Sequence, residues 1–142
     1  MIYFDSNYVA RFYLEDPGWE AVRELATRSS IACCVHGHAE VVSAIHRKLR
    51  EGALKTMECR QLIEQFELDC SQDAYRWLAL SPAVNARVTA TYGSLPKSVF
   101  LRASDALHLA CAAENQLTEI YSNDQRLLVA AEHFGLRASN II

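Results

Sequence analysis

Four acidic residues have the types and positions needed for metal chemistry, and they are spread over nearly the whole chain: Asp5, Glu40, Asp105 and Asp124. Asp5 directly follows the apolar run Ile2-Tyr3-Phe4, and Asp124 comes soon after Glu119-Ile120-Tyr121. In an open parallel sheet, ligands bind beyond the carboxyl ends of the strands. Carboxylates gathered there fill no core and repel one another. Hard cations such as Mg²⁺ and Mn²⁺ take oxygen ligands and relieve that repulsion, so we predict a divalent metal site.

The elements that must position these acids follow from the apolar pattern. Short apolar runs predict strands at 2–4, 31–35, 77–80, 118–121 and 136–138. Helical spacing predicts helices over 7–14, 17–28, 37–51, 55–69, 105–116 and 124–133, with one more opening at Ser81-Pro82. Ser6 and Ser104 are the expected N-caps of two of them. Strands alternating with helices are typical of an α/β fold with a parallel sheet, which brings all four acids to one edge.

Each acid also has a purely structural explanation. Asp5 and Asp124 could cap the helices that follow them, and Glu40, in the first turn of its helix, would favour the helix dipole. Asp105 indicates a site most clearly, because it opens the most apolar helix of the chain, where an unpaired charge is costly. Jointly the four are more informative than any one of them.

Length and composition restrict the function. The 142 residues suit a single domain over 1–142, and 51% hydrophobic with 22% charged residues is ordinary for a globular protein. No apolar run approaches the roughly 20 residues that span a bilayer, and no export signal is visible, so we expect a cytoplasmic protein without membrane contact. The five cysteines show no C-x-x-C spacing and are expected to be reduced thiols. With a net charge of −3, RNA contact needs a local basic patch.

Several other residues allow two interpretations. The basic run Arg47, Lys48 and Arg50 is either a solvated helix end or a surface for RNA phosphates. His36 and His38 flank Gly37 without a second pair at zinc spacing, so the sequence favours no metal role for them. His108 on its apolar helix reads as a satisfied core histidine. Three aromatic residues near the N-terminus, Tyr8, Phe12 and Tyr13, indicate core or a subunit interface.

Three segments resemble one known family. The start Phe4-Asp5-Ser6-Asn7, the segment Arg102-Ala103-Ser104-Asp105-Ala106-Leu107-His108-Leu109-Ala110 and the segment Tyr121-Ser122-Asn123-Asp124-Gln125-Arg126-Leu127 resemble PIN-domain motifs, in order and spacing, with Glu40 as the helix acid. The resemblance covers essentially the full chain. Within that family, the sequence is most similar to VapC-type toxins of prokaryotic toxin–antitoxin pairs.

The resemblance implies a three-layer α/β/α sandwich around a short, mainly parallel sheet. It also implies an endoribonuclease whose Mg²⁺ or Mn²⁺ site comprises Asp5, Glu40, Asp105 and Asp124, with Ser122 as a supporting hydroxyl and Asn7 as a nearby polar contact. A cognate antitoxin would be the partner, in a hetero-oligomer or beside a homodimer. The aromatic helix 7–14 is the expected groove wall for that partner or the homodimer face.

Two rival functions remain open on the sequence. A phosphotransfer or phosphatase domain also places Asp at strand ends, but the second Asp that a haloacid-dehalogenase-type phosphatase needs is replaced by Asn7. A catalytically silent PIN-like binding module would keep the fold and act through a protein partner. Nucleotide-cofactor functions are excluded, because neither G-x-x-x-x-G-K-[ST] nor G-x-G-x-x-G occurs.

Overall fold

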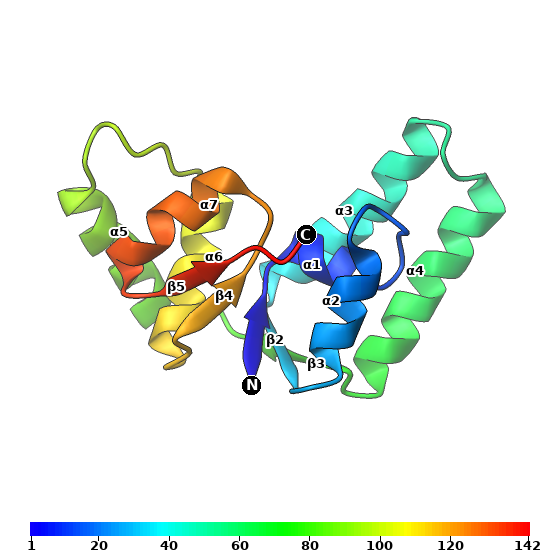
Figure 1. The fold of residues 1–142 in the computed structure, drawn as a ribbon, viewed down its shortest axis with the longest axis horizontal. Helices are drawn as coiled ribbons and strands as arrows, with labels where there is room; N and C mark the ends of the chain where they lie inside the picture. The colour runs from blue at the N-terminus through cyan, green and yellow to red at the C-terminus, as the bar shows by residue number, and fades with distance from the viewer.

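The computed structural model describes residues 1–142 and contains one five-stranded sheet in the order β3-β2-β1-β4-β5 (Figure 1). Its strands are β1 (Ile2–Phe4), β2 (Ile31–Cys34), β3 (Tyr75–Leu78), β4 (Glu119–Tyr121) and β5 (Arg137–Ser139). Every neighbouring pair is parallel. The predicted α/β class with a parallel sheet is therefore confirmed.

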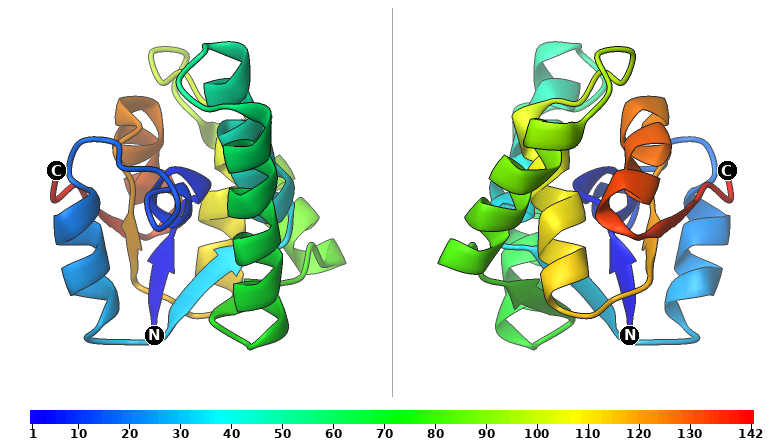
Figure 2. Two further views of the ribbon diagram at one scale, coloured as in Figure 1. Left: turned by 90° about the vertical axis from the view of Figure 1, so that its right-hand side faces the viewer. Right: turned by 90° about the vertical axis from the view of Figure 1, so that its left-hand side faces the viewer.

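Helices cover both faces of the sheet, which gives the three expected layers (Figure 2). They are α1 (Ser6–Ala10), α2 (Trp19–Ala26), α3 (His36–Arg50), α4 (Thr56–Ser71), α5 (Pro82–Ser94), α6 (Ala103–Glu114), α7 (Gln125–Ala130) and the 3₁₀ helix η1 (Ala131–Phe134). Helices α1 to α4 pack on one face, and α5 to α7 with η1 pack on the other. None of these helices combines the length and apolar character that crossing a membrane requires.

Two hydrophobic cores lie on opposite faces of the sheet, because successive strand side chains point in opposite directions. In β1, Tyr3 belongs to the core under α6, and Phe4 belongs to the core under α1 and α3. In β2, Cys34 belongs to the core under α6, and Cys33 belongs to the core under α1 and α3. A strand buried on both faces reads as a continuous apolar run, which is why 31–35 stood out in the sequence. All five cysteines are unpaired, as predicted.

The strand order reverses beside β1, and this reversal positions the site. The chain leaves β1 toward β2 and β3, then returns to add β4 and β5 on the other side of β1. Ligands of open α/β sheets bind at such a switch point, beyond the carboxyl ends of the strands. Here those ends carry Asp5 after β1 and Ser122 after β4. Helices α3 and α7 extend beyond this edge on either side of it (Figure 1).

Several predicted boundaries are wrong. Asp5, not Ser6, caps α1, because its carboxylate accepts the Tyr8 N–H. The helix predicted over 7–14 ends at Ala10, and the chain continues in tight turns in which the N–H groups of residues 11–13 bond three residues back. Helix α6 starts at Ala103 with Arg102 in the cap position, not after Ser104. The third strand begins at Tyr75 instead of 77, because Tyr75 pairs with Ile31. The helix predicted over 124–133 narrows to 3₁₀ geometry after Ala130.

Candidate active site

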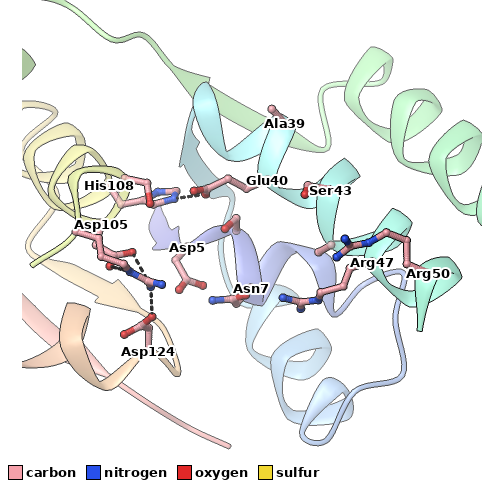
Figure 3. Close-up of a pocket in the computed structure, with 14 residues that line it drawn as sticks. Asp5, Asn7, Ala39, Glu40, Ser43, Arg47, Arg50, Asp105, His108 and Asp124 are labelled. Atoms are coloured by element: carbon pink, nitrogen blue, oxygen red, sulfur yellow. Dashed lines mark hydrogen bonds and ion pairs between the residues drawn. The ribbon is translucent and has the colours of Figure 1, made fainter. Parts of the chain in front are cut away.

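A polar cleft of about 670 Å³ opens at this edge of the sheet (Figure 3). All four predicted acids line it. Only two of its fourteen lining residues are hydrophobic, so the cleft suits a charged ligand better than an apolar one. The lining residues are Asp5, Ser6, Asn7, Ala39, Glu40, Ser43, Ala44, Arg47, Arg50, Arg102, Ser104, Asp105, His108 and Asp124.

Asp5 is a buried carboxylate held by neutral donors. Its residue is 2% exposed, Oδ1 accepts the Tyr8 N–H at 3.0 Å, and Oδ2 accepts the hydroxyl of Ser122. It forms no ion pair with Lys, Arg or His. Burial raises the pKa of Asp5, and the Ser122 hydrogen bond opposes that rise. A buried charge without a cationic partner is costly, so this carboxylate gains most from a bound cation.

Ser122, which follows β4, links the end of that strand to Asp5 at the end of β1. It is fully buried, does not line the cleft, and donates to Asp5 while its oxygen accepts the Asp124 N–H at 3.0 Å. Asp124 in turn caps α7 through Oδ1, which accepts the N–H groups of Arg126 and Leu127. Asp124 therefore has both roles that the sequence allowed, as a helix cap and as a lining residue of the cleft.

Arg102 neutralises two of the acids at once. Its Nε donates to Asp105 Oδ2 at 2.9 Å, and its Nη2 donates to Asp124 Oδ2 at 2.5 Å. The hydrogen bond and charge of Asp105 raise the pKa of Arg102. Asp105 itself is 6% exposed, which confirms that the acid opening α6 is buried. The role of Arg102 was not predicted from the sequence, although its spacing of three residues from Asp105 is the signal for such a pair.

Glu40 is held by a buried relay that starts in the sheet. The Cys34 N–H donates to the Tyr3 oxygen at 2.9 Å, so the Tyr3 hydroxyl proton is free for His108 Nδ1, 2.7 Å away. With Nδ1 accepting, the proton of neutral His108 is on Nε2, which donates to Glu40 Oε2 at 2.8 Å. His108 is thus a satisfied core histidine, as predicted, and also positions Glu40.

The relay keeps Glu40 ionised. Burial alone would raise the pKa of Glu40, but the hydrogen bond from His108 is the strongest effect that opposes burial, and the pKa is lowered to about 2. Glu40 lies in the second turn of α3, not the first, because the helix already starts at His36. The helix dipole therefore contributes less to this carboxylate than the sequence suggested, and His108 contributes more.

Two of the three predicted basic residues line the cleft. Arg47 and Arg50 share the face of α3 that carries Glu40, since these positions are spaced by seven and three residues. Lys48 projects from another side of the helix, and its Nζ pairs with Asp16 at 2.6 Å outside this cleft. The turn of the helix therefore places Arg47 and Arg50 in the cleft and Lys48 outside it. Asn7 lines the cleft from α1, which packs beside α3, and faces the side that carries Asp105 and Asp124 (Figure 3).

The aromatic segment near the N-terminus belongs to the core. Tyr8 and Val9 are fully buried and Tyr13 is 8% exposed, all three within the cluster under α1, α3 and α4. Tyr8 and Val9 therefore do not form the expected partner groove or homodimer face. Its apolar spacing reflected burial against β1 and α3 instead.

Comparison with known proteins places the chain in a family. Residues 2–132 match the PIN domain model, and the chain belongs to the PIN domain family. Its fold is similar to FitAcB from Neisseria gonorrhoeae, at 18% identity and a TM-score of 0.78, covering 99% of this chain and 97% of that one. It is also similar to VapBC2 from Rickettsia felis bound to a promoter DNA fragment, at 17% identity and a TM-score of 0.70, covering all of both chains.

A third similar structure is a toxin–antitoxin complex from Klebsiella pneumoniae, with 14% identity, a TM-score of 0.66 and 94% of each chain covered. At such identities the likeness shows the fold. No protein in the curated set matches the sequence.

The donor set of the cleft fits a hard divalent cation. Mg²⁺ is bound in proteins by one or two carboxylates and keeps several waters, so it needs oxygen ligands at a site open to solvent. The cleft provides four carboxylates, and Asp5 among them is buried without a compensating charge. Asp105 and Asp124 offer further oxygens once Arg102 releases them.

Proposed function

We propose that this PIN domain is a metal-dependent endoribonuclease and the toxin of a type II toxin–antitoxin pair. The observation that carries the enzymatic part is the convergence of Asp5, Glu40, Asp105 and Asp124 on one cleft whose wall also carries arginines. Carboxylates alone would repel RNA, and arginines alone would bind it without chemistry. Their combination suits hydrolysis of a phosphodiester bond.

The four acids would hold Mg²⁺ or Mn²⁺, which when bound supplies charge neutralisation at the phosphate and a water of lowered pKa. The remaining work belongs to the chain. Ser122 and Tyr8 hold Asp5 in place, and His108 holds Glu40 as an ionised carboxylate. An acid outside the metal's direct contacts would accept the proton of the attacking water. Arg47 and Arg50 would bind phosphates beside the cut.

The decisive experiment uses a circular RNA, which has no ends for an exonuclease. We expect the chain with Mn²⁺ to linearise it, EDTA to stop the reaction, and Asp105→Asn to be inactive. Asp73→Asn is the matched control, because Asp73 is an exposed acid without an ion pair, far from the cleft residues in sequence. Linearisation that continues in excess chelator would contradict the metal mechanism.

The same samples test the two rival functions. Mn²⁺ binding by calorimetry without RNA cleavage would favour a silent binding module. Release of phosphate from a small phosphomonoester, with RNA left intact, would favour the phosphatase. In both cases the signal should be lost in Asp105→Asn if it comes from the cleft, and should persist if it comes from a contaminating enzyme or metal binder.

The toxin assignment is supported by the complexes that share this fold. We expect expression of the chain alone to arrest growth, and co-expression of a small adjacent gene to relieve the arrest and yield a co-purifying complex. Asp105→Asn should still co-purify but should not arrest growth. If neither arrest nor a co-purifying protein is found, the nuclease proposal stands and the toxin assignment fails.

A further inference from the structure

His36 has both ring nitrogens buried without a hydrogen-bond partner. The only other such side-chain atom in the molecule is Trp77 Nε1. Buried polar atoms are nearly always paired, and an orphaned one points to a water or an ion that the protein atoms alone do not show. His36 therefore has a ring nitrogen available to a ligand, either a water or an ion.

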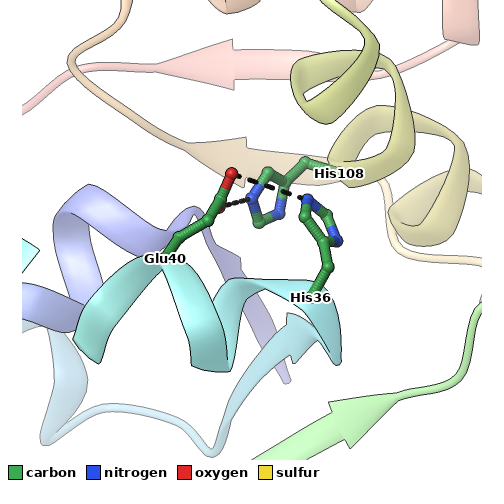
Figure 4. A group of neighbouring side chains, drawn as sticks. All are labelled: His36, Glu40 and His108. Carbon is green, nitrogen blue, oxygen red and sulfur yellow. Dashed lines mark hydrogen bonds and ion pairs between the residues drawn. The ribbon is translucent and has the colours of Figure 1, made fainter. Parts of the chain in front are cut away.

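The surroundings of His36 identify that ligand. A ring nitrogen of His36, a ring nitrogen of His108 and a carboxylate oxygen of Glu40 all lie within 4.8 Å of one another (Figure 4). His36 Nε2 is 3.9 Å from Glu40 Oε1, and His108 Nε2 is 2.8 Å from Glu40 Oε2. Ligand atoms of a tetrahedral zinc ion stand about 3.4 Å apart, given Zn–N bonds near 2.1 Å. The measured spacings lie on either side of that value.

The backbone is built for this close approach. His36 and Glu40 are one turn apart on α3, and the two imidazole rings lie with centroids 4.2 Å apart. Gly37 lets α3 come near α6, since a Cβ there would lie 2.5 Å from Cys33 Sγ and 3.2 Å from His108 Cε1. The His-Gly-His sequence thus has a structural reason that local zinc spacing did not reveal.

We propose that His36, Glu40 and His108 form a binding site for a borderline transition metal such as Zn²⁺. Two imidazoles favour zinc over magnesium or manganese, which prefer oxygen. This site differs from the carboxylate site in its ligands and shares only Glu40 with it. To bind through Nε2, His108 moves its proton to Nδ1, which then donates to the second lone pair of the Tyr3 oxygen. The Tyr3 hydroxyl proton must turn away, which weakens the site without abolishing it.

Binding is tested without RNA. The full chain, freed of metal by chelator and dialysed, is titrated with Zn²⁺ by calorimetry. We expect one site that His36→Ala weakens at least tenfold, because changing even an outer-shell partner of a metal ligand costs about 10–100-fold. His38→Ala is the matched control, since His38 lies on the same helix but pairs with Glu67. Mn²⁺ affinity should differ less than twofold among the three proteins. Equal Zn²⁺ affinity in wild type and His36→Ala, or an equal loss of Mn²⁺ affinity, would overturn the proposal.

A spectroscopic measurement keeps the test independent of mutant folding. Co²⁺ replaces Zn²⁺ and absorbs strongly in visible light when it is tetrahedral with nitrogen ligands, but weakly when octahedral with oxygens. We expect the strong bands from the wild type, removed by added Zn²⁺ and not by Mg²⁺. Weak octahedral bands alone would refute the site.

The functional consequence rests on the proposed nuclease activity. Zn²⁺ at this site withdraws Glu40 from the carboxylate set, so Zn²⁺ should inhibit Mn²⁺-dependent cleavage of RNA. The ratio of rates with and without Zn²⁺ should fall at least tenfold for wild type and much less for His36→Ala. If the wild type cleaves no RNA under any condition while Zn²⁺ still binds, the nuclease proposal fails and the zinc site stands. Equal inhibition of both proteins would refute the regulatory role.

Discussion

The two halves of the cleft hold their carboxylates by different means. Asp105 and Asp124 share one guanidinium, that of Arg102, whose side chain is 49% exposed. Asp5 and Glu40 have only neutral donors, namely a backbone N–H, the Ser122 hydroxyl and the His108 imidazole. The half with Asp105 and Asp124, the Arg102 half, is neutralised by a half-exposed arginine. The half with Asp5 and Glu40, the fixed half, is held by neutral groups and keeps its negative charge.

This difference determines where a cation acts. The Asp5 half lacks a positive charge, so a metal adds something new there. In the Arg102 half, a metal exchanges with an existing partner. If the proposed cation binds, the fixed half would set its position, and the Arg102 half would tune its affinity. Substitutions in the two halves should therefore change metal binding and cleavage by different amounts.

Asp5→Asn should remove more than about 99% of RNA cleavage, since replacing a ligand costs at least as much as the 10–100-fold loss typical of its outer-shell partners. Circular-RNA linearisation measures the loss, with Asp73→Asn as the control. In metal-free buffer at pH 7 the same change should raise the melting temperature, because it removes a buried charge. Wild-type cleavage by Asp5→Asn would show that the fixed half does not hold the metal.

The pH dependence of that stabilisation has a definite sign. Burial raises the folded-state pKa of Asp5 above its unfolded value. The folded protein therefore binds this proton more tightly, and the charged carboxylate destabilises the fold above that pKa. The gap in melting temperature between Asp5→Asn and wild type should be full at pH 7 and close as pH falls through the folded pKa. A constant gap from pH 7 to pH 3 would refute this explanation.

His108→Gln should lower cleavage by about 10–100-fold, as expected for a residue that orients a ligand. A simple loss of packing would also reduce activity, so the informative measurement is a double-mutant cycle with Glu40→Gln on Mn²⁺ affinity. If His108 acts through Glu40, the two changes together should cost little more than Glu40→Gln alone. Additive losses would show that His108 affects the fold and not Glu40.

A general rule for parallel sheets placed the acids that follow strand ends, whereas the partners that hold the acids depend on tertiary contacts. Asp5 and Asp124 come directly from the parallel-sheet rule, because short apolar runs precede them. The partners of Glu40 could not be read, since His108 lies 68 residues away and its role depends on the packing of α3 against α6. The sequence left Tyr8 and Tyr13 as either core or interface for a related reason, since an apolar stripe does not tell whether core or partner covers it.

Arg102→Ala should raise Mn²⁺ affinity by about twofold to fivefold, because half-exposed ion pairs contribute up to about 1 kcal/mol. Without the guanidinium, Asp105 and Asp124 no longer exchange a partner when the metal binds. Calorimetry compares this variant with Arg126→Ala, which removes an arginine of α7 that does not line the cleft. Weaker Mn²⁺ binding in Arg102→Ala would mean that Arg102 organises the carboxylates instead of competing for them.

Arg47→Ala and Arg50→Ala should produce the smallest effects, and these should appear in RNA affinity. Each arginine that binds a phosphate contributes about 0.7 to the slope of log K against log salt for a single strand. Binding of an uncleaved RNA to the Asp105→Asn protein, measured from low to moderate salt, should show that slope reduced for either variant. Lys48→Ala is the matched control, because Lys48 lies between them in sequence but pairs with Asp16 outside the cleft. An equal reduction for Lys48→Ala would indicate that the whole helix end attracts RNA, and that the cleft face of α3 has no special role.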